Sequence, residues 1–272
     1  ADPNVRGTQG ERMLTLAAKT GRPDLVKALM DGGATVDFFG AAAILDMSAM
    51  KDFLKGDSSL AGATDDNGLT GLHYCAGSSL GLVTETHLER QLGVIDLLLD
   101  AGADPNLEIH MGMAITPLVA CCWSGGVVPV IQSLVRGGAD PNHPQTLRSA
   151  LRHFKKKRSS ENRVADALVD CGCEIDGLMD DSRRTCLHLY SHHEEIQAVS
   201  WLLKHGASVE ARTADERTPL HLAADRNNDI TVVELLISHG ADVEATDTRG
   251  KKPIDYAQEN GKTRVVAFLS NQ

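Results

Sequence analysis

The sequence predicts an all-α solenoid, in which short helix-turn-helix repeats are stacked side by side along the chain. Two observations predict it. First, Gly-Ala or Gly-Cys pairs recur with glycine-to-glycine steps of 69, 36, 34, 34 and 34 residues, at Gly33, Gly102, Gly138, Gly172, Gly206 and Gly240. Second, apolar helical segments precede these pairs, as at residues 94–99 and 230–237. Stacked repeats form a long open binding surface and seldom an enclosed reaction pocket.

The segment 211–244 gives the clearest view of one repeat. Thr218 and Pro219 open its first helix, because a Thr side chain can accept a bond from first-turn N–H groups and Pro suits the first helical position. Residues 230–237 form a second, apolar helix. We expect Gly240 to end this helix in the left-handed conformation, which glycine adopts at little cost.

Related opening segments recur at 13–18, 70–76, 116–120 and 185–189. Together with Thr218-Pro219-Leu220-His221-Leu222-Ala223 they resemble the ankyrin repeat, whose signature includes Thr-Pro-Leu-His-x-Ala. The resemblance covers nearly the whole chain and implies about eight helix-turn-helix repeats joined by short β-turn fingers. We expect one array over residues 1–272, with approximate repeats 5–37, 38–62, 63–106, 107–142, 143–176, 177–210, 211–244 and 245–272.

The two ends of the array differ. The last repeat has Pro253-Ile254-Asp255-Tyr256 in place of the signature and is rich in polar residues, which is typical of a C-terminal capping repeat. The first four residues, Ala1-Asp2-Pro3-Asn4, match the ends of complete repeats at 103–106 and 139–142. We therefore expect the chain to be part of a longer array on its N-terminal side.

Repeats two and three depart from the period. Repeat two (38–62) is short and lacks the opening signature, and repeat three (63–106) exceeds the 34-residue period by about ten residues, placed between Ser78 and Arg90. Insertions in solenoids usually become loops on one face. We expect a surface loop here, either tolerated or used for binding.

Repeat five (143–176) is the most divergent and carries the basic block Lys155-Lys156-Lys157-Arg158. In a chain of net charge −10 such a block could bind an acidic peptide or a phosphate, or act as a nuclear-import signal. The alternative is a solvated helix end, where cations suit the negative terminus of the helix dipole.

The resemblance implies that partners contact the concave face, made by the first helices and the fingers. The residues expected to be exposed there follow the paired small residues of each first helix, and they include Lys19, Thr20, Gly77, Ser78, Trp123, Ser124, Lys156, Lys157, His192, His193, Asp225 and Arg226. Trp123 is the most informative, because exposed tryptophans are favoured at interaction hot spots. Trp201 falls in an apolar second helix and is expected in the core.

The fingers add further candidates. Arg184 and Arg217 lie beside acidic residues on their fingers, a mixture that selects a charge-patterned partner. Met111 and Met113 on the finger of repeat four suggest an adaptable apolar contact close to Trp123. The candidate partner-binding residues are Met111, Met113, Trp123, Lys156, Lys157, Arg184, His192, His193, Arg217, Asp225 and Arg226.

The eleven histidines give little support for chemistry. His73, His188 and His221 occupy the signature position, where the resemblance implies hydrogen bonds between loops. His188 and His192 have a metal-compatible spacing, but no His-Glu-x-x-His motif, phosphate-binding loop or nucleophile elbow occurs. We predict no catalytic residue, no metal site and no cofactor.

Composition narrows the class of partner. The net charge of −10 argues against a general nucleic-acid binder, and no apolar run approaches the length that spans a bilayer. The six cysteines mostly replace small residues of sister repeats, which indicates free thiols in buried positions and a reducing compartment, the cytoplasm or the nucleus.

The leading prediction is a non-catalytic, monomeric module that binds a partner protein or peptide, acidic near the basic block, through the concave face and finger tips. One alternative is a small-molecule or enzymatic site at the divergent repeats five and six, near His192 and His193. Another is the targeting segment of a larger enzyme or channel.

Overall fold

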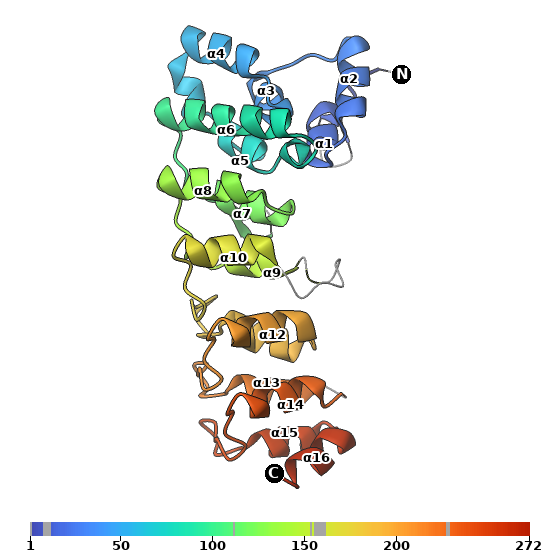
Figure 1. Cartoon of the computed structure of the whole chain (residues 1–272), viewed down its shortest axis with the longest axis vertical. Helices are drawn as coiled ribbons and strands as arrows, with labels where there is room; N and C mark the ends of the chain where they lie inside the picture. Colours follow the sequence, from blue (N-terminus) through green and yellow to red (C-terminus); the bar gives the residue numbers. More distant parts are fainter. Residues whose placement is uncertain (1, 8–11, 111, 153, 155–161, 227–228) are drawn as a thin grey trace. The chain divides into compact units, whose positions relative to one another are not determined.

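The computed structural model describes residues 2–7, 12–110, 112–152, 154, 162–226 and 229–272 (Figure 1). Sixteen α-helices and one two-stranded hairpin occur in this part of the chain, so the predicted all-α fold is confirmed. The chain divides into two compact bodies. We call Ala1–Ala150 with Arg163–Cys171 the N-terminal body and Leu151–Asn162 with Gly172–Gln272 the C-terminal body.

The N-terminal body consists of helix pairs. Its helices are α1 (Met13–Lys19), α2 (Pro23–Asp31), α3 (Phe38–Ile44), α4 (Met47–Gly56), α5 (Gly71–Ala76), α6 (Glu85–Asp100), α7 (Pro117–Trp123), α8 (Val128–Arg136), α9 (Thr146–Leu151, whose last residue belongs to the other body) and α10 (Arg163–Asp170). The first helices α1, α3, α5 and α7 pack in sequence as one layer, and α4, α6, α8 and α10 pack as a second layer. Two 3₁₀ turns, η1 (Ser58–Gly62) and η2 (Leu80–Leu82), complete this body.

The C-terminal body repeats the same pattern more regularly. Its helices are α11 (Cys186–His192), α12 (Ile196–Lys204), α13 (Pro219–Arg226), α14 (Thr231–Ser238), α15 (Pro253–Glu259) and α16 (Thr263–Leu269). Here α11, α13 and α15 pack as one layer, with α12 and α14 adjacent in the other. The sixteen helices therefore form eight successive pairs, as predicted, whereas the division into repeats of one continuous domain stays a prediction.

Capping residues explain where these helices begin and end. The side chains of Thr70, Thr116 and Thr218 accept hydrogen bonds from the third residue of the helix that follows. At the far end of the pair, Gly240 has φ +91° and the next residue, Ala241, donates its N–H to Leu236 O at 3.1 Å. The predicted left-handed cap is confirmed, and a side chain at Gly240 would strain the backbone.

The fingers are short, and buried histidines hold them. The finger before α7 contains the antiparallel pair β1 (Ile109–His110) and β2 (Ala114–Ile115). His73 Nδ1 accepts the Thr70 N–H at 3.3 Å, which leaves its Nε2–H to bond Ile115 O at 3.2 Å. His188 and His221 make the same bonds to Arg217 O and Lys251 O, both at 3.1 Å. The loop-bonding role that the family resemblance implied is confirmed.

The extra residues of repeat three form only part of the expected surface loop. They lengthen α6 to 16 residues, starting after Thr84, and add the 3₁₀ turn η2. Ser78, expected to be exposed, is buried. The reason is Gln91, a fully buried amide whose Nε2 donates to Cys75 O at 2.8 Å and to Ser78 O at 3.0 Å. The expected exposure of Ser78 was wrong, whereas the surface loop is present in part, with Leu82 and Val83 exposed at its tip.

Candidate functional site

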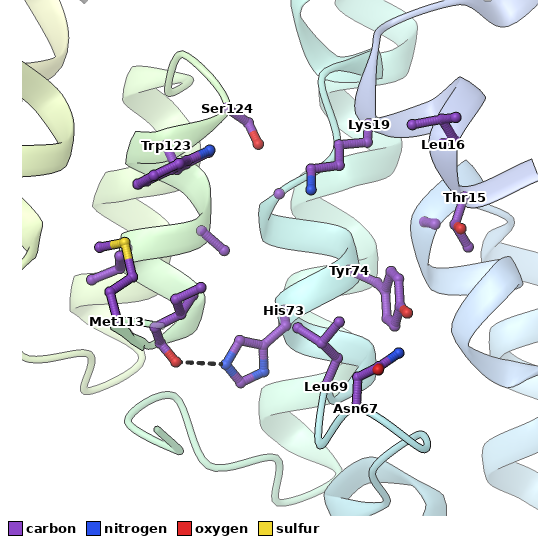
Figure 2. Close-up of a pocket in the computed structure, with 15 residues that line it drawn as sticks. Thr15, Leu16, Lys19, Asn67, Leu69, His73, Tyr74, Met113, Trp123 and Ser124 are labelled. Carbon is purple, nitrogen blue, oxygen red and sulfur yellow. Dashed lines mark hydrogen bonds between the residues drawn. The ribbon is translucent and has the colours of Figure 1, made fainter. Parts of the chain in front are cut away.

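A hollow of about 280 Å³ lies on the first-helix layer of the N-terminal body (Figure 2). One wall comes from α1, the floor from α3 and α5, and the other wall from α7 and its finger. Most of its lining is apolar, and the larger apolar side chains are Leu16, Leu69, Met113, Ile115, Val119 and Trp123.

Small residues on the floor make the hollow. Ala43 and Gly77 lie between the two walls, where a longer side chain would fill the space. A Cβ built on Gly77 would lie 3.7 Å from both the Ala120 methyl and the Ser124 hydroxyl, so only small side chains surround this part of the floor. Figure 2 shows Trp123 and Met113 on the α7 side of this space, with Lys19 across it.

Polar groups at the edge of the hollow are held by defined partners. Tyr74 donates its hydroxyl to Asp65 Oδ2 at 2.8 Å, and burial together with this carboxylate raises the pKa of Tyr74 well above its ordinary value. The bond between His73 and Ile115 fixes the finger that carries Met113. Burial lowers the pKa of His73, so the ring stays neutral and keeps this bonding pattern near pH 7.

A second hollow of about 230 Å³ adjoins the first and shares Thr15, Asn67 and Tyr74 with it. Its lining is charged and contains Arg6, Arg12, Asp37, Asp65 and Asp66. Arg12 pairs with Asp37 at 2.8 Å.

Two of the predicted partner-binding residues meet at the first hollow. Trp123 is exposed, with 41% of its surface accessible, and Met113 is half-buried beside it. The predicted exposure of Trp123 is therefore confirmed, as is the burial of Trp201, which is 4% exposed. Met111 lies outside the described residues.

Four other candidates meet in the C-terminal body. His192 ends α11, and Asp225 and Arg226 end its neighbour α13, so their charges act on one another. The rings of His192 and His193 are 5.0 Å apart, edge to face. Partial burial and then the neighbouring His193 and Arg226 lower the pKa of His192. Asp225 accepts a bond from Asn260 Nδ2 at 2.7 Å, whereas Arg226 is exposed.

The two finger arginines are engaged within the chain. Arg184 bonds Asp180 Oδ2 at 2.6 Å, and Arg217 stacks on the ring of Tyr256 at 4.5 Å from its centroid. Arg217 is also mostly covered, with 22% of its side chain exposed. Lys156 and Lys157 of the basic block lie outside the described residues.

Nothing in the described part of the chain groups three or more His, Cys, Asp or Glu side chains in a way that could hold a metal ion.

Five of the six cysteines are buried, as predicted, and Cys171 is partly exposed. Burial raises the pKa of Cys121 to about 11 and raises that of Cys75 further, so both stay protonated and unreactive at neutral pH.

Tyr74 and Leu16 also line the hollow, although neither was among the predicted partner-binding residues. The available signal for Tyr74 was its position directly after the signature His73 on a helix whose other face is buried.

Of the helices described, none combines the length and the apolar character needed to cross a bilayer.

The comparisons with known proteins agree with this architecture. The family model described as "Ankyrin repeats (3 copies)" matches residues 156–247 and 213–272. The chain is 28% identical over 222 residues, 82% of its length, to human "Neurogenic locus notch homolog protein 1". It is 29% identical over 142 residues, 51% of its length, to the chicken (Gallus gallus) "Nuclear factor NF-kappa-B p105 subunit". These matches span only 8% and 14% of the two relatives.

A solved structure extends the likeness to the fold. The human ASB11 ankyrin repeat domain superposes with a TM-score of 0.61 at 22% identity, covering 86% of this chain and 98% of that domain. At that identity the likeness concerns the fold alone. The signature segments, the bonded histidines, the eight helix pairs and these matches lead to one assignment: the chain is an ankyrin repeat protein.

Proposed function

We propose that this chain is a non-catalytic module that binds a partner protein or peptide through its first-helix surface and finger tips. Ankyrin repeats generally mediate protein–protein interactions, and the fold is typically an interaction scaffold rather than an enzyme. The observation that carries the proposal is the apolar hollow of the N-terminal body, with exposed Trp123 and half-buried Met113 on its rim.

The size and lining of the hollow suit side chains of a protein partner. Its volume of about 280 Å³ is just below that of ligand pockets, which start at about 300 Å³, so it fits one or two side chains better than a whole cofactor. Tryptophan buries a large area at low entropic cost, and methionine adapts to the shape of what it meets. Both properties favour a binding hot spot.

The C-terminal body would offer a second, charged contact surface to a partner. His192, His193, Asp225 and Arg226 form a mixed polar cluster at the ends of α11 and α13. Arg184 and Arg217 add cations on the fingers, and Lys156 and Lys157 would favour an acidic stretch of the partner. Mixed charges of this kind contribute more to choice of partner than to affinity.

The wider setting follows from charge and cysteine usage. With a net charge of −10 the chain would bind neither nucleic acid nor an anionic membrane surface in general, and it would resist self-association and act as a monomer. Its thiols suit a reducing compartment, the cytoplasm or the nucleus.

Quantitative affinity capture from cell lysate tests the proposal. The wild type is compared with Trp123→Ala and with Leu25→Ala, a matched loss of an exposed apolar side chain from α2, which contributes nothing to the hollow. We expect a saturable partner whose yield falls about tenfold or more with Trp123→Ala and stays unchanged with Leu25→Ala. Equal recovery with both variants would refute this assignment of the surface.

A further inference from the structure

We propose, as an extension of the proposed function, that the hollow of the N-terminal body recognises a linear peptide in which a large apolar side chain stands near an acidic one. The apolar side chain fills the space between α1 and α7, and the acidic group pairs with Lys19.

The shape of the hollow supports the apolar half of this motif. Gly77, Ala43 and Ala120 line it with no more than a methyl group each, while Leu16, Met113 and Trp123 stand around them. A single aromatic or long aliphatic side chain entering from solvent would be surrounded by apolar groups. Burying it stabilises the complex roughly in proportion to the apolar area removed from water.

Lys19 supports the acidic half. It is the last residue of α1, it is exposed, and Figure 2 shows it reaching into the hollow from the end near Trp123. Among the described residues no hydrogen bond or ion pair engages its ammonium group. An acceptor from a partner could therefore bind it without displacing an existing contact, next to the apolar side chains of Leu16 and Trp123.

The charges of the adjoining hollow set the direction of the peptide. Arg12 is already paired with Asp37, and Asp65 with the Tyr74 hydroxyl, so these groups are satisfied within the chain. Asp66 is exposed on the finger side and would repel a carboxylate there. The acidic residue of the partner therefore lies toward the C-terminal ends of α1 and α7, away from the finger.

A peptide selection tests both halves of the motif. Random twelve-residue peptides displayed on phage are selected against the whole chain, and the affinity of an enriched peptide is measured by fluorescence anisotropy. We expect enriched peptides to combine an aromatic, Leu, Ile or Met residue with a nearby Asp or Glu. Ala120→Leu, which fills the hollow, weakens binding about tenfold or more, whereas Ala28→Leu, an exposed methyl on α2, leaves it unchanged.

The decisive step is a charge exchange. Lys19→Glu weakens the acidic peptide about tenfold, and replacing the peptide's Asp or Glu by Lys restores binding to this variant but not to the wild type. Lys27→Glu, an exposed lysine on α2, is the matched control and changes nothing. Circular dichroism checks that each variant is folded; if Ala120→Leu is not, the charge exchange still decides.

Three results would overturn the inference. They are enriched peptides without an acidic residue, affinities that ignore both Lys19→Glu and Ala120→Leu, and a selection that enriches no peptide. None of them refutes the proposed function, because capture of a folded partner by the wild type and its loss with Trp123→Ala would still support the first-helix surface. Failure of that capture experiment would refute the proposed function independently.

Discussion

The first-helix surfaces of the two bodies differ in how they use their side chains. In the N-terminal body, Ala43 and Gly77 leave an apolar hollow beside Lys19, whose ammonium group none of the described residues pairs. In the C-terminal body, the corresponding region holds polar groups that satisfy one another: Asp225 accepts from Asn260, and Arg217 stacks on Tyr256. One surface is therefore open to an incoming apolar side chain, while the other presents charged groups that already have neutral partners within the chain.

The regularity of the repeats explains much of this difference. Glycine steps of 34 residues place equivalent groups of the C-terminal body in register, so finger contacts recur from His188 to Arg217 O and from His221 to Lys251 O. In the N-terminal body the 69-residue step contains a short repeat and a long one. Departures from the repeat signature thus occur in the same body as the hollow on the first-helix layer.

Replacing the two tryptophans should give the largest difference in stability between the two bodies. Trp201 is 4% exposed and stacks on His205 with ring centroids 3.9 Å apart, so Trp201→Ala should lower the free energy of unfolding by about 3–5 kcal/mol. Trp123 is 41% exposed, and Trp123→Ala should change it by about 1 kcal/mol or less. Urea denaturation followed by far-ultraviolet circular dichroism measures both.

The two replacements should affect partner binding in the opposite order, with the larger loss of affinity from Trp123→Ala. If Trp123 belongs to the binding surface, its replacement weakens binding at nearly unchanged stability. A loss of stability as large as that of Trp201→Ala would instead mean that Trp123 is a core residue and that the hollow does not exist as described.

The pH dependence of the free energy of unfolding tests the histidine contacts that hold the fingers of the C-terminal body. Burial lowers the pKa of His188 to about 4, against about 6.5 in the unfolded chain. Above pH 6.5 the ring is neutral in both states. As the pH falls from 6.5 to 4, only the unfolded chain takes up this proton, so the free energy of unfolding declines by about 3 kcal/mol and then levels off.

His188→Gln tests the origin of this decline. The variant should be less stable than the wild type at pH 7.5, because the bond to Arg217 O is weakened, but its stability should fall less steeply between pH 6.5 and 4. His193→Gln, which removes an exposed histidine directly after α11, is the control for the loss of a histidine side chain. Urea midpoints at several pH values provide the measurement, and an unchanged slope in His188→Gln would contradict the assignment.

Most of the fold was readable from the sequence because the repeat is local and periodic. Thr218, Pro219 and Gly240 mark helix ends by their own conformational preferences. The conformation of the extra residues of repeat three was not predicted. It depends on the buried side-chain amide of Gln91, which donates hydrogen bonds to two backbone carbonyls of the preceding segment. A usable signal was present: Thr84 caps a helix that can run from Glu85 without interruption.

The candidate site was only partly predictable. Counting from the signature placed Trp123 on the exposed surface and Met113 near it, because both depend on position within a single repeat. The hollow itself arises from the sizes of Ala43, Gly77 and Ala120, which come from three different repeats. Recognising it from sequence would require comparing equivalent positions across repeats and noticing the small residues between larger ones.

The smallest expected effect concerns a finger of the C-terminal body. Arg184 bonds Asp180 at 2.6 Å, but both side chains are solvent-exposed, by 46% for Arg184 and 34% for Asp180. Solvent-exposed pairs of this kind contribute little, so Arg184→Ala should change the free energy of unfolding by less than about 1 kcal/mol. Urea denaturation at low and high salt measures the change, and the difference between variant and wild type should shrink further as salt screens the pair.

This small effect makes Arg184 a useful probe of the comparison between the bodies. Because Arg184→Ala leaves the fold intact, any loss of partner affinity would report a direct contact with the finger and would extend the binding surface into the C-terminal body. Unchanged affinity would confine recognition to the N-terminal hollow. A drop in stability of about 2 kcal/mol or more would contradict both readings, since it would mean that the Arg184–Asp180 pair holds the finger in place and cannot separate binding from folding.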